Sequence, residues 1–269
     1  MHRKKPLALV LNGSQRPVPS RGPNKNGIGY AIEMITTNIS NIDIRSISLY
    51  DKALENYQYD KVKHIQIKPK IFYKLLFKII FCLPYSFLKK VYGFTVADRQ
   101  IYYYSIGMEL KRLKPDIVIS QTHYYLFAAA KKYFPNAKHI FHFRGSNLTD
   151  WRKELIEDLY QRSDGLITVC KFPINDVSNK LGLLHHNYSV IPNAINKNLF
   201  NQDIDKEQTK RLIKKYKVNE ESFVFLYAGR MDKSKGIYQI INVFNKLNKI
   251  RSNTVLLIVG KNLSKYDDD

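Results

Sequence analysis

Short apolar runs alternate with segments of helical periodicity along most of this chain. The apolar runs lie at residues 6–11, 42–48, 116–122, 139–143, 165–170 and 188–193. Helical periodicity is found at about 28–40, 97–114, 124–133 and 151–161. Strands buried in a parallel sheet read as continuous apolar runs, and helical crossovers join them. The alternation therefore predicts an α/β fold, with a doubly wound, Rossmann-like domain over residues 1–196.

A second, smaller α/β region is predicted over residues 197–269. It contains two helix-like segments, at 206–216 and 236–250, and two apolar runs, at 222–229 and 253–260. The run at 222–229 is rich enough in β-branched and aromatic residues to predict a buried strand. A sheet this small is poorly stable with an uncovered face. We expect that it packs on the first domain or that part of the domain is missing.

Composition sets the class of protein. With 44% hydrophobic and 13% aromatic residues, the chain can build a real core. Cys82 and Cys170 stand far apart without a CxxC pattern, which indicates neither a disulfide framework nor a zinc site, so reduced cytoplasmic thiols are expected. The apolar run near the N-terminus is too short for a signal peptide.

The strong positive charge limits the expected partners. A net charge of +21 suits nucleic acid or an anionic membrane surface. We find no helix-turn-helix or RRM signature, so no nucleic-acid partner is predicted, although the 19 tyrosines leave stacking on single strands open.

The segment 70–94 leaves two interpretations open. Its apolar residues can share a broad helical face that is fringed by Lys74, Lys78, Lys89 and Lys90, as in a helix that lies in an anionic lipid interface. The alternative is a pair of core helices broken at Pro84. The lysines and the proline exclude a transmembrane span.

Two cations occupy a predicted strand-to-helix turn in the sequence YAGRMDKSKG, at 227–236. Arg230 and Lys235 follow an apolar strand and precede a helix, whose first N–H groups attract anions. In an open α/β sheet, ligands bind at this end of the strands. The pair therefore predicts a phosphate-bearing ligand, the alternative being two solvated surface residues.

The order of motifs resembles the family-4 glycosyltransferases, two-domain enzymes of the GT-B fold that transfer sugars from nucleotide donors. The resemblance rests on four stretches: SRGPNKNGIGYAIEMI at 20–35, AKHIFHFRGS at 137–146, the pair SDGLITVCKF and YSVIPNAINKNLF at 163–172 and 188–200, and FLYAGRMDKSKGIYQIINVFNKL with VLLIVG between 225 and 260. Within the family, the chain looks most like lipopolysaccharide-core and surface-polysaccharide transferases, including N-acetylglucosaminyltransferases.

The resemblance implies roles for particular residues of the two domains. Gly229, Arg230 and Lys235 would bind the diphosphate of a nucleotide sugar, expected to be UDP-linked, without a metal or other cofactor. His142 would lie close to the reacting sugar. The family position could instead fall on Arg144, and a strand-end histidine is otherwise often a rim residue of the core.

The remaining implications concern the glycine loop, the acceptor and the location. Gly27 and Gly29 would let backbone approach a ligand, the alternative being a plain turn. The acceptor would be a lipid-linked glycan, lipopolysaccharide or another envelope glycan, and transfer would retain anomeric configuration. The protein would be cytoplasmic and peripheral at the inner face of the membrane.

The chain departs from the family pattern near its end. The family's Glu, seven residues, Glu motif is absent, and Ala194 stands where the family has glycine. We therefore expect an incomplete donor domain, and an inactive remnant or a membrane-associated partner subunit stays open beside the enzyme, as does, more distantly, a basic nucleic-acid-binding protein. The acidic run at 267–269 is a charged chain end rather than a metal site.

Overall fold

The computed structural model describes residues 5–12, 27–68, 97–145, 148–185, 187–195, 205–219, 221–231 and 235–260. The chain divides into two compact units, Met1–Ile195 and Asn196–Asp269, called unit 1 and unit 2 below. The segment 70–94, the acidic run at 267–269 and Cys82 lie outside the described residues. Within the described ranges, no helix combines the length and apolarity needed to cross a bilayer.

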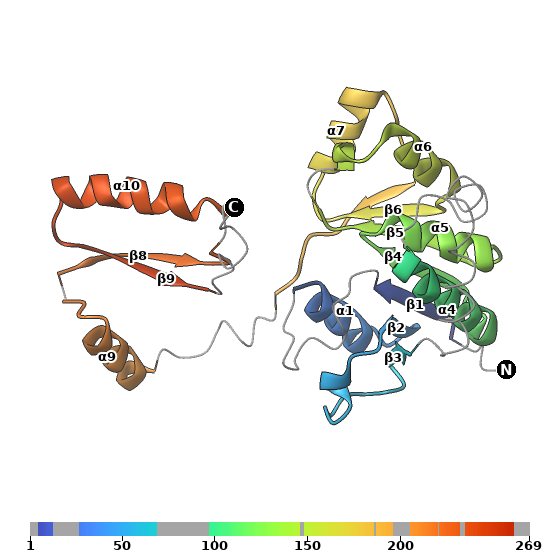
Figure 1. The fold of residues 1–269 in the computed structure, drawn as a ribbon, viewed down its shortest axis with the longest axis horizontal. Helices are drawn as coiled ribbons and strands as arrows, with labels where there is room; N and C mark the ends of the chain where they lie inside the picture. The colour runs from blue at the N-terminus through green and yellow to red at the C-terminus, as the bar shows by residue number, and fades with distance from the viewer. Residues whose placement is uncertain are drawn as a thin grey trace. The chain divides into compact units, whose positions relative to one another are not determined.

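Unit 1 is built on a seven-stranded parallel sheet with strand order β3-β2-β1-β4-β5-β6-β7 (Figure 1). Its strands are β1 Leu7–Asn12, β2 Asp43–Leu49, β3 His64–Ile67, β4 Ile117–Gln121, β5 Lys138–Phe143, β6 Gly165–Thr168 and β7 Tyr188–Val190. Its helices are α1 Gly27–Asn38, α4 Ala97–Leu113, α5 Tyr124–Tyr133, α6 Lys153–Arg162 and α7 Phe172–Leu181, with short 3-10 turns η1 Lys52–Leu54 and η2 Leu148–Asp150. The predicted doubly wound α/β fold is confirmed.

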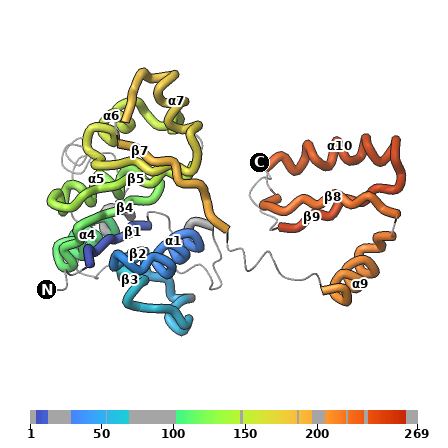
Figure 2. Tube along the Cα trace, turned by 180° about the vertical axis from the view of Figure 1, so that it is seen from behind, coloured from blue at the N-terminus to red at the C-terminus, as the bar shows by residue number. Residues whose placement is uncertain are grey.

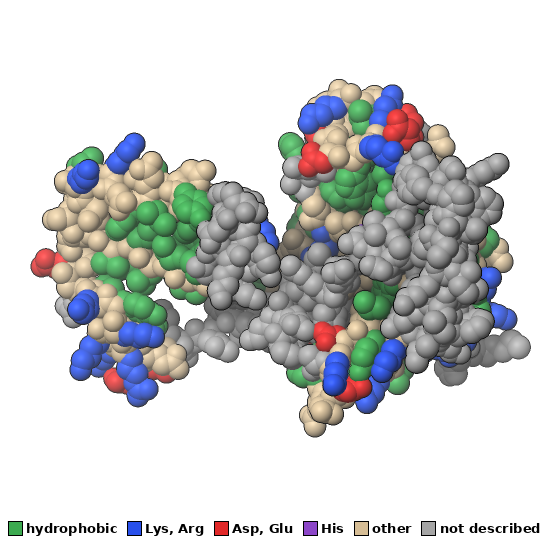
Figure 3. Space-filling view, in the orientation of Figure 1, with side chains coloured by type: hydrophobic (Ala, Val, Ile, Leu, Met, Phe, Trp, Pro, Cys, Tyr) green, Lys and Arg blue, Asp and Glu red, His purple; other side chains and the backbone are tan. Residues whose placement is uncertain are grey.

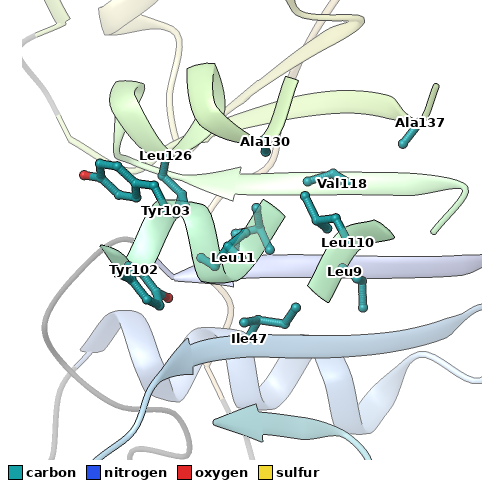
Figure 4. Close-up of a cluster of buried hydrophobic side chains, with 11 residues drawn as sticks. Leu9, Leu11, Ile47, Tyr102, Tyr103, Leu110, Val118, Leu126, Ala130 and Ala137 are labelled. Atoms are coloured by element: carbon teal, nitrogen blue, oxygen red, sulfur yellow. The ribbon is translucent and has the colours of Figure 1, made fainter. Parts of the chain in front are cut away.

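Helices cover both faces of this sheet because the strand residues alternate between two apolar layers. Leu9 and Leu11 of β1 pack with α4 and α5, in the cluster drawn in Figure 4. Ala8 and Val10 point the other way and pack against Ile32 of α1. On the side of the sheet that α5 covers, a further cluster joins β5 and β6 to α5, α6 and α7. The central strands are therefore buried on both sides, as their continuous apolar sequences predict.

Unit 2 is a two-stranded parallel sheet with helices α9 Lys206–Lys215 and α10 Ile237–Ile250. Its strands are β8 Phe223–Ala228 and β9 Thr254–Val259, paired in register from Phe223 with Thr254 to Ala228 with Val259. The path β8, α10, β9 is a βαβ unit, which can be followed in Figure 2. The elements predicted for this region are confirmed within two residues.

The structure corrects the sequence prediction in three places. It adds β3 and α7, which were not predicted; α7 carries Pro173 in its first turn and ends at Gly182, whose φ of 66° is left-handed. It also contradicts the predicted burial of β8, whose residues Phe223–Leu226 are 38–66% exposed. The cause is the size of the sheet: two strands and one packed helix leave apolar side chains in solvent, as Figure 3 shows on unit 2.

Candidate functional site

The strand order of unit 1 places a topological switch point between β1 and β4. From β1 the chain proceeds outward to β2 and β3, and it then returns to β4 and proceeds the other way to β5, β6 and β7. The crossovers that leave β1 and β4 therefore diverge at the carboxyl ends of these two strands. Open α/β sheets bind ligands at such a point.

Three buried polar side chains lie side by side at this edge. Asn12, the last residue of β1, is the Cα partner of Gln121 in β4, and Gln121 is the partner of His142 in β5. Their exposed fractions are 1%, 3% and 6%. Asn12 has the same strand parity as Ala8 and Val10, so the row lies on the sheet face that α1 covers. Buried polar side chains are almost always hydrogen-bonded, so the side chains of this row need polar partners.

Two atoms of this row have no partner among the described residues. Gln121 Nε2 lies 3.1 Å from His142 Nδ1, whereas Gln121 Oε1 and His142 Nε2 are buried without a hydrogen bond. An unsatisfied buried polar atom costs about 1–3 kcal/mol. With the Gln121 amide donating, the ring proton of His142 lies on Nε2. The row therefore offers a free acceptor and a free donor to a ligand.

The charge state of His142 follows from its burial. Burial, with a smaller contribution from the positive charge of Arg144, lowers the pKa of His142 to about 4. The imidazole is therefore neutral at neutral pH. In this neutral form it can donate or accept a hydrogen bond.

Thr122 connects the ends of β4 and β5 in a strained conformation. Its φ of 50° is in the left-handed region, which a β-branched residue rarely adopts. Its N–H donates to the His142 carbonyl at 2.9 Å, and its Oγ1 accepts from the Arg144 N–H at 3.3 Å. Strain of this kind persists where surrounding contacts over-determine the backbone, and it concentrates at functional sites.

The sequence predicted that Gly27 and Gly29 lie in a glycine loop. In the structure both lie in the first turn of α1. α1 follows β1, so its N-terminus lies at the same edge of the sheet as the polar row. Both glycines are therefore part of a helix start at the carboxyl edge of the sheet. The prediction failed because glycine is a poor helix former, but its cost of about 1 kcal/mol relative to alanine is small enough for tertiary packing to override.

Unit 2 presents the predicted cationic turn between β8 and α10. Arg230 and Lys235 are both exposed, and Gly236, with φ of 70°, is the N-cap of α10. The Tyr227 hydroxyl donates to the Arg230 carbonyl at 2.7 Å, and the Gly229 N–H donates to Val259 at 2.9 Å. The turn is therefore tied to the end of the sheet, with both cations before a helix start.

A second glycine shapes this turn and was missed by the sequence analysis. A Cβ on Gly260 would collide with the carbonyl oxygen of Gly229 and lie 2.7 Å from its carbonyl carbon. The backbones that leave β8 and β9 touch at these two residues. The closing Val-Gly of the β9 stretch was the available signal.

Other polar residues of the site were also missed. Asn12, Gln121 and Thr122 were not singled out, although each ends an apolar run, in the sequences LVLN and VISQT. A polar residue that directly follows a buried parallel strand was the signal. Across the described part of the chain, no three His, Cys, Asp or Glu side chains gather as metal ligands would.

Two regions of the chain match family models of known proteins. Residues 89–199 match the family model described as Glycosyltransferase Family 4, and residues 208–268 match the model described as Glycosyl transferases group 1. No curated protein sequence gives a significant match.

Solved structures share the fold. A glycosyltransferase from Rickettsia africae ESF-5 superposes with a TM-score of 0.54 at 15% identity, over 96% of this chain and 69% of that one. Sucrose-phosphate synthase from Thermosynechococcus elongatus superposes with a TM-score of 0.62 at 12% identity, over 96% of this chain and 62% of that enzyme. The chain carries a Glycosyltransferase Family 4 region followed by a Glycosyl transferases group 1 region, on the GT-B-like α/β fold of glycosyltransferases.

Proposed function

We propose that this chain transfers a sugar from a nucleotide-sugar donor, UDP-linked, to an acceptor of bacterial lipopolysaccharide or another cell-envelope glycan, with retention of anomeric configuration. The observation that carries the proposal is the turn of unit 2, where Arg230 and Lys235 stand between a parallel strand and a helix start. This turn lies within the region that matches the Glycosyl transferases group 1 model.

The chemistry of such a transfer suits the turn. As the glycosidic bond of the donor breaks, the leaving nucleoside diphosphate gains negative charge, and fixed cations stabilise the transition state more than the ground state. Arg230 offers a planar fork and Lys235 a mobile point charge, so the two are not interchangeable. Gly229 precedes them where a Cβ would lie 3.3 Å from Cζ of Tyr227, and the first turn of α10 adds its N–H dipoles.

Unit 1 supplies the acceptor side in this proposal. His142, held by Gln121 at 3.1 Å, is a neutral hydrogen-bond donor for a hydroxyl of the reacting sugar. Because its pKa is low, we assign it a hydrogen bond that orients the sugar and not the transfer of a proton to it. Gly27 and Gly29 lie in the first turn of α1, and we propose that the positive end of this helix attracts a polar group of the ligand.

The proposal also includes the absence of a metal cofactor and a location in the cell. Arg230 and Lys235 supply the positive charge that a metal would otherwise provide, so transfer proceeds without one. The net charge of +21 favours attachment to an anionic surface, and we propose a peripheral position at the inner face of the cytoplasmic membrane.

Calorimetric titration with UDP tests the diphosphate role. A hydrogen bond to a charged group contributes about 1.5–3 kcal/mol, so Arg230→Gln and Lys235→Gln should each weaken UDP binding by about tenfold or more. Lys249→Gln is the matched control, because it removes an exposed cation from the opposite end of α10. Unchanged UDP affinity in both turn variants would remove the diphosphate role.

A transfer assay tests the rest of the proposal. The chain is incubated with UDP-glucose, UDP-galactose or UDP-N-acetylglucosamine and a lipopolysaccharide core acceptor, with and without EDTA. We expect one donor to yield product with retained anomeric configuration by NMR, at a rate that EDTA leaves unchanged. UDP binding without transfer to any acceptor would favour the noncatalytic partner.

A further inference from the structure

Among the described residues, Arg144 is a half-buried cation without a balancing carboxylate. It follows β5 by one residue, and burial lowers its pKa. Arginine is seldom buried in proteins unless it is paired with an anion. The described contacts therefore leave a charge at the edge of the sheet that the protein itself does not neutralise.

The partners of Arg144 are neutral. Its Nη2 donates to Asn193 Oδ1 across the end of the sheet, and its backbone N–H donates to Thr122 Oγ1. A guanidinium has further N–H donors that these contacts leave unused.

The cation lies next to the polar row of the switch point. Arg144 follows His142 by two positions, and its charge contributes to the lowered pKa of that histidine. The free Nε2–H of His142 and the unused guanidinium N–H groups are therefore donors of one neighbourhood. The guanidinium of this neighbourhood fits an oxyanion, because its fork binds two oxygens of a phosphate or carboxylate at once.

We propose that Arg144, oriented by Asn193 and Thr122, binds an oxyanion group, phosphate or carboxylate, carried by the acceptor. The inference rests on the proposed function for the assignment of unit 1 to the acceptor, and it narrows the acceptor to an anionic glycan. The donor diphosphate is met by Arg230 and Lys235 of unit 2, so the anion at Arg144 is a second one.

The test is a set of titrations on the full chain with three probes: inorganic phosphate, glucuronate and UDP. Arg144→Gln should weaken binding of phosphate or glucuronate by about tenfold or more. Lys138→Gln is the control, because it removes one exposed charge from the opposite end of the same strand, and it should change either affinity less than about twofold. Whichever probe binds more tightly to the unmodified protein identifies the anionic group.

UDP separates the acceptor site from the donor site. Arg144→Gln should keep UDP affinity within about twofold, because Arg144 does not meet the donor diphosphate. A parallel loss of UDP binding would overturn the assignment to the acceptor. Absence of UDP binding in the unmodified protein would instead contradict the proposed function, and the phosphate and glucuronate arms would still report on Arg144.

A structural role for Arg144 makes a different prediction. If the contact with Asn193 only braced the chain, Arg144→Gln and Asn193→Ala would both lower the unfolding temperature without ligand, and phosphate or glucuronate would bind equally to every variant. We expect instead that Arg144→Gln unfolds within about 2 °C of the unmodified protein and loses the stabilisation by anion.

Arg144→Lys keeps the charge and loses the fork, so it should bind the anion several-fold more weakly. This variant replaces Arg144→Gln in the titrations if Arg144→Gln does not fold. Equal anion binding by Arg144→Lys and the unmodified protein would overturn the proposal.

Discussion

The two units hold their candidate ligand-binding residues in opposite ways. In unit 1 the polar row is almost fully buried, and helices on both faces of a seven-stranded sheet fix the strands beneath it. In unit 2 the cationic turn is exposed, and the two strands beneath it leave their apolar side chains 38–66% exposed along Phe223–Leu226. Small sheets with open faces are weakly stable, so unit 1 is expected to be the rigid partner and unit 2 the adaptable one.

Matched leucine truncations give the largest expected difference between the units. Leu9 of β1 is fully buried, and Leu9→Ala should destabilise unit 1 by about 2–5 kcal/mol, since truncation leaves a cavity. Leu226 of β8 is 66% exposed, and Leu226→Ala should cost less than about 1 kcal/mol. Urea unfolding followed by the fluorescence of Trp151, the one tryptophan of the chain, reports unit 1. Hydrogen exchange in β8 and β9 reports unit 2.

Similar losses from both leucines would contradict the comparison. They would mean that Leu226 is covered in solution by something beyond the contacts of unit 2. The exchange data locate the effect, because a loss confined to β8 and β9 cannot arise from the core of unit 1.

The pH dependence of stability should also separate the units, because all seven histidines belong to unit 1. The folded pKa of His142 is about 4, below its ordinary 6.5, so its contribution is fully present above about pH 6.5 and is lost as the pH falls toward 4. This loss amounts to about 3 kcal/mol. His64 and His139, whose pKa values burial also lowers, add to it in the same direction.

His142→Gln isolates the contribution of this histidine. Between about pH 7 and pH 4, the variant should lose about 3 kcal/mol less than the unmodified protein in unfolding followed by Trp151 fluorescence. Exchange in β8 and β9 of unit 2, corrected for intrinsic rates, should change little over pH 7 to about 5. Identical slopes for the variant and the unmodified protein would show that His142 is not buried in its neutral form.

The fold of unit 1 could be predicted from sequence because its signal is repeated. Every strand except β3 belongs to an apolar run and most crossovers have helical periodicity, so the α/β class followed without any single motif. β3 and α7 escaped for local reasons: HIQI is short with a histidine at its start, and α7 opens on Phe172 and Pro173. Pairing with a neighbouring strand stabilises β3. Pro173 is tolerated because an N–H in the first turn of a helix makes no intrahelical hydrogen bond.

The candidate site was predicted less completely than the fold. The cations of unit 2 could be placed because both flanking elements are strongly patterned. The row of Asn12, Gln121 and His142 could not be assembled, because the register that aligns the three strands is a tertiary property. The exposure of β8 was mispredicted for a related reason, since composition does not say whether a neighbour covers a strand.

A pair of glycines reverses the comparison and makes unit 2 the more sensitive region. Gly260→Ala would bring a Cβ against the Gly229 backbone, and relief requires a shift in the cationic turn. We expect a loss of about 1–3 kcal/mol in unit 2, together with weaker UDP binding. Gly165→Ala in β6 places its Cβ at an ordinary 3.6 Å from Asn187 and should change the stability of unit 1 by less than about 0.5 kcal/mol.

Exchange protection and UDP titration on the same two glycine variants measure these effects. If Gly260→Ala kept both the protection of β9 and the UDP affinity, the close approach of the two strand ends would play no part in holding the turn.

The smallest expected effect concerns two lysines that end helices in a left-handed conformation. Lys114 follows α4 with φ of 48°, and Lys217 lies two residues beyond α9 with φ of 52°. Glycine adopts this conformation without a Cβ penalty, so Lys114→Gly should stabilise unit 1 by about 0.5–1 kcal/mol. The midpoint of thermal unfolding, followed by Trp151 fluorescence, should then shift upward by about 2–4 °C.

Lys217→Gly should leave this transition unchanged, because α9 belongs to unit 2, whose stability is expected to vary independently. If Lys217→Gly shifted the Trp151 transition as much as Lys114→Gly does, the units would unfold as one cooperative body, and the division into a rigid and an adaptable part would be wrong.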